Sequence, residues 1–254
     1  RNPRAGFPNF WRYACGHFLV VGALASSPSR KLVSRQKRGC GLTLSLAQGL
    51  RQGLSDLALP LTDQQQGQLL DYLALLLKWN KVYNLTSVRD PEQMLDQHLM
   101  DCLAAIPELL HEFPAACDVL DVGCGGGLPS VVFAIACPQW RVTAIDAVAK
   151  KTAFVQTVAH ALKLTNLDVI HGRVEELSQT FDLVTCRAFA ELADFTRWTA
   201  ASLNPSGRWL AMKGKYPQAE IERLPKEVLI EKVQTLRVPG LDADRCLVWL
   251  SPNR

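Results

Sequence analysis

The chain has 254 residues, of which 48% are hydrophobic and 20% are charged, enough apolar material for one large globular domain or for a domain with an appendage. No apolar run reaches the roughly 18 residues that a membrane span requires, which argues against an integral membrane protein. The formal net charge of +4 is unevenly placed, because the first 40 residues contain eight basic residues and no acidic ones, leaving 20 basic and 24 acidic residues in the rest. The body of the chain is therefore mildly acidic, and any nucleic-acid binding must come from a local basic patch.

The cysteines give no sign of cross-linking or of metal binding. Eight are scattered along the chain, and none forms a C-x-x-C pair. A disulfide framework or a zinc site would show regular spacing. We therefore expect no metal, and a reducing, cytoplasmic location.

Residues 1–42 differ in composition from everything that follows, because they mix proline, glycine and serine with basic residues. The apolar stretch at 18–25 follows Arg12 and resembles the hydrophobic region of a signal peptide. The rest of the chain has no secreted character. We therefore expect an extension that is disordered, or not native to the folded part.

Residues 43–115 predict a helical segment. Leucines at helical spacing between 42 and 59 predict a first helix, which Pro60 interrupts. Thr62 is a suitable N-cap for a second helix, which should run to about Lys81.

A third predicted helix begins at Asp90 and Pro91, a cap and a residue suited to the first helical position, and should end near Pro107. His98 and Asp101 are three residues apart and therefore share one face of this helix. A catalytic His–Asp pair is one interpretation. We favour the other, a polar surface pair or a pair that holds the helix over a neighbouring cleft.

Residues 78–87 combine two lysines, two asparagines and two aromatic residues. This composition allows two interpretations. Trp79 and Tyr83 can pack into the core at the end of a helix. Alternatively, the aromatic and basic side chains can stack on an RNA strand and neutralise it. Composition alone does not decide between them.

From residue 118 on, short apolar stretches alternate with helical ones, which predicts a parallel sheet with crossover helices. The last two apolar stretches have no helix between them and predict an antiparallel finish. Strands are expected at 118–123, 141–146, 167–171, 181–186, 207–213, 228–237 and 245–250, and helices at 129–137, 148–163, 190–202 and near 217–224.

The most informative stretch is the glycine-rich turn after the first of these strands. Four of the residues from 123 to 127 are glycines, and Pro129 then suits the start of a helix. The next strand ends in Asp146, about 20 residues beyond the turn, the spacing at which a carboxylate meets a ribose in dinucleotide-type folds. The turn and the acid together predict a nucleoside at the carboxyl edge of the sheet.

The form of the turn distinguishes between nucleosides. A nicotinamide-binding fold requires G-x-G-x-x-G, and Leu128 stands where the last glycine belongs. The pattern D-V-G-x-G-x-G from Asp121 instead resembles the first motif of class I S-adenosylmethionine (SAM) methyltransferases. That resemblance implies that Asp121 helps to hold the turn, that Asp146 binds the ribose hydroxyls, and that the acidic stretch at Glu175 meets the adenine. The alternative for each acid is a helix N-cap.

Several segments together resemble one family, the bacterial 16S ribosomal RNA (guanine-N7)-methyltransferase G, RsmG, also called GidB or glucose-inhibited division protein B. The resemblance covers residues 44–254, and its first and fifth segments are far more specific than the glycine turn. The matching segments are KWNKxYNLTS from Lys78, HLxD from His98, DVGxGxGLP from Asp121, RVEE from Arg173, RAFA from Arg187 and KG from Lys213.

The resemblance implies a class I SAM-dependent methyltransferase fold. This is a Rossmann-like, mostly parallel seven-stranded sheet with helices on both faces, preceded here by N-terminal helices. The methyltransferase domain is then expected at 116–254, after the helical segment at 43–115 and the extension at 1–42.

The family's cofactor is SAM, and the resemblance implies that the glycine turn, the segment after the third strand and the end of the fourth strand contact it. The predicted cofactor-binding residues are Asp121, Gly123, Gly125, Gly127, Leu128, Asp146, Val174, Glu175 and Arg187.

The family's substrate is a single guanine of 16S ribosomal RNA, guanine 527 in the 530 loop, which is methylated at N7. This atom carries a lone pair and no proton, so in-line attack on the methyl group needs no general base, and positioning becomes the main requirement. Arg187 is expected to position the reactants by holding the SAM carboxylate, a phosphate or guanine O6. Lys213 and Lys215 are expected to hold phosphates at the same edge, which makes Arg187 and Lys213 the candidate catalytic residues.

The expected partner is 16S rRNA, within the small ribosomal subunit or an assembly intermediate of it. No coiled coil or exposed apolar repeat is visible, so a monomer is expected. The predicted RNA-binding residues are Lys78, Asn80, Lys81, Asn84, Arg89 and Lys215.

Three other functions remain to be weighed. A methyltransferase of small molecules would keep the cofactor site, would enclose its substrate, and would use residues 78–87 for packing only. A non-catalytic module that binds RNA or nucleotides is disfavoured by the intact turn, Asp146 and Arg187. A dehydrogenase is disfavoured by the form of the turn.

Overall fold

The computed structural model describes the backbone of residues 30–253 and the side chains of residues 43–253. The chain divides into two compact units, Arg1–Cys40 and Gly41–Arg254. The predicted extension at 1–42 lies outside the described residues, apart from the backbone of residues 30–42 at the start of α1. Among the described residues, no helix is both long and apolar enough to cross a membrane.

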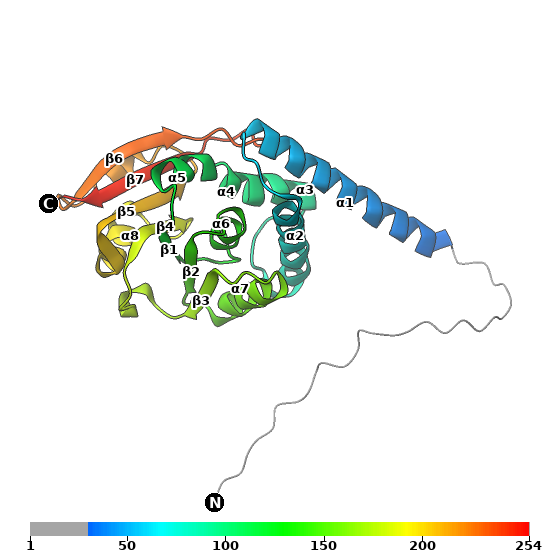
Figure 1. Cartoon of the computed structure of the whole chain (residues 1–254), viewed down its shortest axis with the longest axis horizontal. Coiled ribbons are helices and arrows are strands. Elements are labelled where there is room, and N and C mark those ends of the chain that lie inside the picture. The colour runs from blue at the N-terminus through cyan, green and yellow to red at the C-terminus, as the bar shows by residue number, and fades with distance from the viewer. Residues whose placement is uncertain (1–29, 254) are drawn as a thin grey trace, which may run out of the picture. The chain divides into compact units, whose positions relative to one another are not determined.

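A seven-stranded sheet with the order β3-β2-β1-β4-β5-β7-β6 forms the centre of the second unit (Figure 1). The first five strands are parallel, and β7 runs antiparallel to both of its neighbours, β5 and β6. The predicted mostly parallel seven-stranded sheet with an antiparallel last part is therefore confirmed, and the structure adds that β7 lies between β5 and β6. The strands are β1 Asp118–Val122, β2 Arg141–Asp146, β3 Leu167–His171, β4 Phe181–Arg187, β5 Leu203–Lys213, β6 Val228–Thr235 and β7 Cys246–Pro252.

The helices begin largely where their capping residues predict. Thr62 forms a capping box with Gln65, and the Asp90 carboxylate accepts hydrogen bonds from two backbone N–H groups of the next helix. The α-helices are α1 Arg30–Asp56, α2 Asp63–Tyr83, α3 Pro91–Met94, α4 Asp101–Leu103, α5 Ile106–Glu112, α6 Ser130–Ala136, α7 Ala149–Ala161, α8 Leu192–Thr199 and α9 Gln218–Ile221, and 3₁₀ turns lie at η2 Val174–Glu176 and η3 Ala200–Ser202.

The third predicted helix differs from the expectation. After α3 the backbone widens into a π-helical turn, η1 Leu95–Met100, before α4 continues the run. The run ends at Leu103, and α5 starts with Pro107 in its first turn, where a missing N–H costs nothing. Hydrophobic periodicity does not reveal a π turn, because it inserts a residue without changing the apolar character of the segment.

Apolar side chains pack against both faces of the sheet and form two cores. Successive residues of β1 alternate between them, as strand geometry requires. Val119 belongs to the core that α2, α6 and α7 cover, whereas Leu120 and Val122 belong to the core that α8 covers. Helices therefore cover both faces, and the loops at the carboxyl edge are left to form a site.

Helix α2 is joined to the sheet domain by polar side chains as well as by its apolar face. The Gln65 amide donates to the Ile135 carbonyl at the end of α6 (2.8 Å), and the Gln68 amide donates to the Leu162 carbonyl at the end of α7 (2.9 Å). The buried Tyr72 hydroxyl donates to the Gly126 carbonyl within the glycine turn (2.7 Å). These bonds satisfy acceptors that would otherwise be orphaned, so α2 supports the turn directly.

Replacing Tyr72 with Phe tests this support. We expect the free energy of unfolding, measured with urea, to fall by about 1–2 kcal/mol, because the buried Gly126 carbonyl loses its donor. Tyr83→Phe, at the exposed end of the same helix, should change it by less than about 0.5 kcal/mol. Equal stability of Tyr72→Phe and the native protein would contradict a supporting role for the hydroxyl.

Candidate active site

The glycine turn lies at the carboxyl edge of the sheet, between β1 and α6, and neighbouring segments fix its backbone. The N–H groups of Gly123 and Cys124 both donate to the Ile145 carbonyl of β2 (2.9 and 3.1 Å). The N–H of Gly125 donates to Asp146 Oδ2 (3.0 Å). Gly123 has a φ of +70°, and a Cβ atom there would lie 2.3 Å from the ring of Phe189, so only glycine fits.

The structure shows Asp146 at a helix start, one of the two roles that the sequence left open, and the ribose role stays a prediction. Its Oδ1 accepts a hydrogen bond from the N–H of Val148, just before α7 (2.8 Å), as a carboxylate at a helix start does. Its Oδ2 accepts from Gly125 and lies 3.5 Å from Lys151 Nζ. A carboxylate oxygen can accept more than one hydrogen bond. Asp146 therefore still has capacity to bind a ligand in the cleft that it lines.

This cleft, named here the Asp146 cleft, has a volume of about 320 Å³ and brings predicted cofactor residues together. Gly123, Asp146, Val174 and Glu175 all line it, although they come from three different strand ends. Val174 is buried, whereas Glu175 is exposed and forms an ion pair with Arg173 (2.7 Å). The arrangement suits a nucleoside, with apolar surface for a base and a carboxylate for a sugar diol.

Two more clefts continue along the same edge. The glycine-turn cleft, about 280 Å³, is lined by Gly125, Leu128 and Lys151. The Arg187 cleft, about 380 Å³, lies beyond it. Ala188 lines all three clefts and has a φ of +51°, a left-handed conformation that residues other than glycine seldom adopt and that is typical of functional sites.

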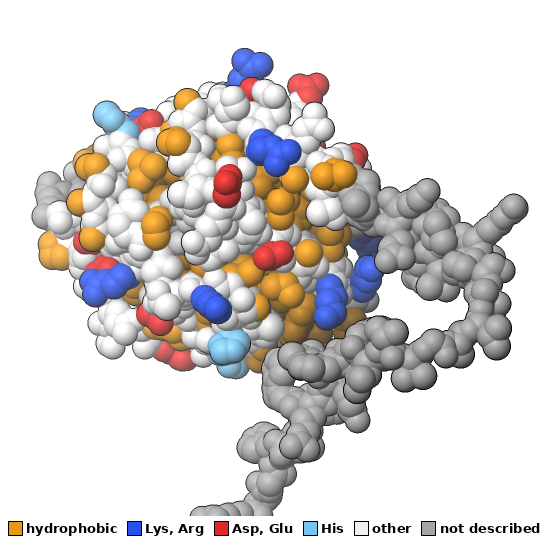
Figure 2. Space-filling model, turned by 45° about the vertical axis from the view of Figure 1, so that its right-hand side comes forward, with side chains coloured by type: hydrophobic (Ala, Val, Ile, Leu, Met, Phe, Trp, Pro, Cys, Tyr) orange, Lys and Arg blue, Asp and Glu red, His pale blue; other side chains and the backbone are white. Residues whose placement is uncertain are grey.

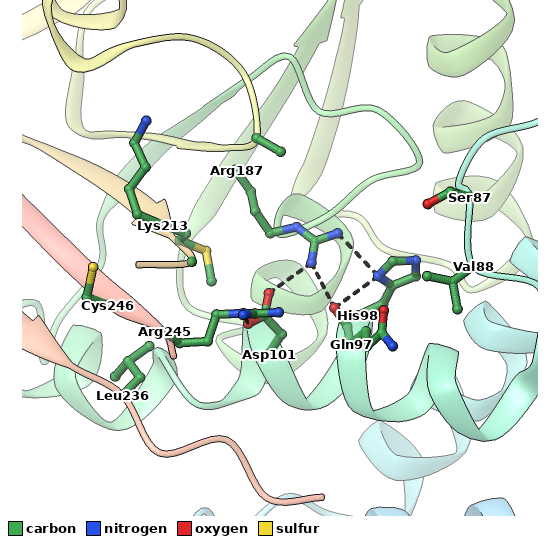
Figure 3. Close-up of a pocket in the computed structure, with 13 residues that line it drawn as sticks. Ser87, Val88, Gln97, His98, Asp101, Arg187, Lys213, Leu236, Arg245 and Cys246 are labelled. Atoms are coloured by element: carbon green, nitrogen blue, oxygen red, sulfur yellow. Dashed lines mark hydrogen bonds and ion pairs between the residues drawn. The ribbon is translucent and has the colours of Figure 1, made fainter. Parts of the chain in front are cut away.

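Arg187 ends β4 and lines both the glycine-turn cleft and the Arg187 cleft. Its Nη1 donates to the Gln97 carbonyl (3.0 Å) and to Asp101 Oδ2 (2.9 Å), and its Nη2 lies 3.4 Å from His98 Nδ1 (Figure 3). The other oxygen of the buried Asp101 accepts from Arg245 Nε (2.7 Å). Among the described residues, the hydrogen-bond partners that fix this guanidinium thus come from the π turn and the start of α4.

A catalytic His98–Asp101 pair is not present. Asp101 is occupied by the two arginines, while His98 Nε2 lies 2.7 Å from the Thr86 hydroxyl and Nδ1 lies 3.0 Å from the Gln97 carbonyl. Burial, and then the nearby Arg187 charge, lower the pKa of His98 to about 4, so its ring is neutral at pH 7. Both residues are buried, so they hold the helical run over the clefts and do not form a surface pair.

Asp121 and Gly127 lie beneath the turn and do not line the clefts, which corrects the expectation that they contact a cofactor directly. Asp121 Oδ2 accepts from the N–H of Ser130 (3.1 Å), which ties β1 to the start of α6, as expected of a residue that holds the turn. A Cβ on Gly127 would lie 2.5 Å from Val131, so this glycine serves helix packing. Burial raises the pKa of Asp121 to about 6.

Two other predicted site residues are occupied within the protein. Lys213 Nζ donates to Glu220 (2.7 Å) and to the Ala190 carbonyl (3.0 Å), and Figure 3 shows it turned away from the Arg187 cluster. Lys213 is therefore paired within the protein although it lines the Arg187 cleft, and its catalytic or phosphate-binding role stays a prediction. Asn80 is buried, donates to the Val88 carbonyl and accepts from the N–H of Thr86. It shapes the loop after α2 and is not placed to bind RNA.

The remaining predicted RNA-binding residues are exposed. On the face that Figure 2 shows, basic side chains are dispersed singly among acidic and uncharged ones. Trp79 packs against Phe154 and stacks on Tyr83, with ring centroids 5.4 and 5.2 Å apart, so packing is the role that the structure gives it. The exposed residues are Lys78, Lys81, Asn84, Arg89 and Lys215.

Lys151, Phe189, Gln97 and Arg245 line the clefts but are not among the predicted site residues. Lys151 carried a usable signal, because it stands in the first turn of the helix that follows Asp146. Phe189 lies inside the recognised RAFA segment, and its ring is what requires glycine at 123. Gln97 and Arg245 carried no signal, since only tertiary contacts bring them to Arg187. In the described part of the chain, no group of three or more His, Cys, Asp or Glu side chains is arranged to hold a metal.

Comparison with known proteins agrees with these features. A family model described as rRNA small subunit methyltransferase G matches residues 65–248. The ribosomal RNA small subunit methyltransferase G of Acidovorax ebreus is 54% identical over 217 residues, which cover 82% of this chain and 96% of that protein. The protein of the same name from Polaromonas naphthalenivorans is 52% identical over 213 residues, with the same coverage of each chain.

Solved structures share the fold at much lower identity. A mutant form of MtNAS in complex with S-adenosylmethionine superposes with a TM-score of 0.52 at 13% identity, over 74% of this chain and 79% of that one. A second structure of the same mutant superposes with a TM-score of 0.50 at 14% identity, over 75% of each chain. This likeness concerns the arrangement of helices and strands.

The raised pKa of Asp121 predicts a pH-dependent stability. Between about pH 4 and pH 6 the folded protein binds a proton at this carboxyl that the unfolded chain has released, so this contribution to stability decreases as pH rises. Asp121→Asn should therefore raise the free energy of unfolding at pH 7 by roughly 1–3 kcal/mol, and the gain should vanish near pH 4. Denaturant unfolding at several pH values measures this. The exposed Asp168→Asn is the control, and a gain independent of pH would contradict the assignment.

Proposed function

The chain belongs to the rRNA small subunit methyltransferase G family, and from this membership we propose that it transfers a methyl group from S-adenosylmethionine to N7 of one guanine, guanine 527, of 16S rRNA. The bond from the methyl carbon to sulfur breaks as the bond to N7 forms. The products are S-adenosylhomocysteine and a 7-methylguanine that carries the positive charge. No proton moves in this step.

N7 is chosen as the acceptor atom because, among the described residues, no side chain beside Arg187 is free to act as a general base. His98 has both ring nitrogens occupied and a pKa of about 4, and both oxygens of Asp101 accept from guanidinium groups. An acceptor amine or hydroxyl would need a group to take its proton. Guanine N7 has a lone pair and no proton, so it suits a site whose candidate bases are occupied.

The residues at the first two clefts fit the methyl donor. The Asp146 carboxylate would accept hydrogen bonds from the ribose hydroxyls, and Val174 with Glu175 would lie at the adenine. The backbone from Gly123 to Leu128 would lie along the methionine part. When bound, SAM supplies an electrophilic methyl group on its sulfonium.

Arg187 would act by positioning. Its Nη1 is committed to the Gln97 carbonyl and to Asp101, and its Nη2 lies near His98 Nδ1. Its Nε makes no hydrogen bond to the described residues, so Nε and the second N–H of Nη2 would hold the SAM carboxylate, a phosphate or guanine O6. It lines both the cleft of the donor and the cleft beyond it, so it stands between the two reactants. Holding reacting atoms in line can lower a barrier by about 7–11 kcal/mol in favourable cases.

RNA would bind over the surface formed by the end of α2 and the loops beside it, where Lys78, Lys81, Asn84 and Arg89 are exposed, and at Lys215 after β5. Such side chains contact phosphates and carry the salt dependence of binding. The proposal takes the small ribosomal subunit or its assembly intermediate as the partner, the cytoplasm as the location, and a monomer as the working form.

The experiment that tests this function uses labelled SAM and small subunits that lack the modification. We expect label in a single guanine, with 7-methylguanine as the only modified base after hydrolysis. Label in small metabolites alone would instead favour a small-molecule methyltransferase. If the protein binds SAM but no label reaches the RNA, a non-catalytic module would be favoured.

A double variant tests the RNA surface. Lys78→Ala with Lys81→Ala should weaken binding to the subunit and reduce the slope of log K against log salt by about 1–2, while the Kd for SAM stays unchanged. Filter binding across a salt series and calorimetry with SAM measure the two effects. Lys226→Ala, at an exposed position after α9, is the matched control. Equal losses of RNA and SAM binding would instead indicate that Lys78 and Lys81 have a structural role.

A further inference from the structure

The Arg187 cleft lies outside the two clefts assigned above to the cofactor, and its position beside them is informative. It shares Ser87, Arg187 and Ala188 with the glycine-turn cleft, so the two spaces adjoin. In-line transfer requires the acceptor atom to approach the methyl group from the side opposite to the sulfur. The acceptor must therefore occupy a space that adjoins the donor's space, and the Arg187 cleft meets this requirement.

We propose that the Arg187 cleft receives the acceptor guanine, turned out of its RNA, and that Gln97 and Arg245 recognise the base. The inference rests on the function proposed above and adds the binding site of the base. The cleft's volume of about 380 Å³ is at the small end of ligand pockets, which span about 300–1,000 Å³, and it suits one base with part of its sugar. Enzymes that modify a base in structured nucleic acid commonly extrude it into such a pocket.

Gln97 offers an unused amide group in this cleft. Its backbone carbonyl binds Arg187, which fixes the residue, but its side chain makes no hydrogen bond to any residue that the structure describes. A primary amide presents a donor and an acceptor side by side. Guanine presents the complementary pair along one edge, an acceptor at O6 and a donor at N1. The amide is thus suited to hold the base while N7 stays free.

Arg245 supplies the element that distinguishes guanine from adenine. Its Nε binds Asp101 and its Nη1 binds the Asp244 carbonyl, whereas its Nη2 makes no hydrogen bond to the described residues. Because Asp101 also binds Arg187, the two guanidinium groups are fixed relative to each other. A guanidinium donor favours O6 of guanine and opposes the amino group that adenine carries at the same position.

The test compares Gln97→Ala with Gln93→Ala, an exposed glutamine four residues earlier in the same helical run. Methyl transfer to unmodified small subunits should fall in kcat/KM by about tenfold to a hundredfold for Gln97→Ala, which is the effect of losing one good contact to a base. The Kd for SAM and the Tm should remain those of the native protein. Gln93→Ala should react at the native rate, and a native kcat/KM for Gln97→Ala overturns the proposal.

A second variant, Arg245→Lys, keeps a cation beside Asp101 and removes the forked donor. It should lower kcat/KM on guanine and reduce the preference over a subunit with adenine at the target position, with a Tm close to native. An unchanged preference overturns the role of Arg245. Loss of SAM binding in either variant would show a disturbed cofactor site and would also count against the assignment.

The native protein in the same assay separates this inference from the proposed function. If it labels guanine N7 and Gln97→Ala does so equally, only the inference fails. If it labels no RNA, the proposed function fails, and the cleft is tested by saturation-transfer NMR with guanosine 5′-monophosphate in the presence of S-adenosylhomocysteine. A signal that Gln97→Ala abolishes supports a guanine site, whereas no signal, or an equal one in both proteins, overturns it.

Discussion

The carboxylate of Asp101 is the interaction on which the arrangement of the site depends. It is buried, and each of its oxygens accepts from a different arginine, one at the end of β4 and one directly before β7, 86 and 144 positions away in the chain. Breaking a buried ion pair by removing one partner typically costs about 3–5 kcal/mol, because the remaining charge stays desolvated. The helical run that carries Asp101 is thereby fixed against the carboxyl edge of the sheet, and so is the guanidinium of Arg187. The π turn before Asp101 adds the Gln97 carbonyl and His98 to the same contact.

The glycine turn is held in a comparable way, by groups that do not themselves face the clefts. Asp121 binds the start of α6 from beneath, and the Tyr72 hydroxyl of α2 binds the Gly126 carbonyl. Asp146 is the exception, since it fixes the Gly125 N–H and also lines a cleft. A turn supported on several sides is preorganised, and the methyl transfer proposed above, which moves no proton, would depend mainly on such preorganisation. The N-terminal helices therefore belong to the methyltransferase site as much as the sheet does.

The fold and the family membership give different information about this protein. A protein with only 13% identity shares the arrangement of strands and helices, so this arrangement by itself says nothing about the acceptor. Relatives with more than half of their residues identical carry one name, and their resemblance extends through the helices before the sheet. The Arg187 cleft, proposed above for the acceptor, is built where those helices meet β4, β5 and β7. Differences in substrate among proteins of this fold are expected to arise there, because the half of the sheet that holds the nucleoside serves any methyl acceptor.

The amino-acid sequence alone predicts the mostly parallel sheet with its antiparallel last strands, the caps at Thr62 and Asp90, and the glycine turn with Asp146 at the next strand end. These features follow from local patterns: alternating apolar stretches, capping residues, and glycines that a tight turn requires. Which polar groups remain free depends instead on tertiary contacts. Asn80 and Lys213 look like RNA ligands in sequence, but one shapes a loop and the other pairs with Glu220, whereas Gln97 and Arg245 gave no signal and line the cleft. The physical reason is that a side chain's availability depends on the partners that packing brings to it from distant segments, and no local pattern records them.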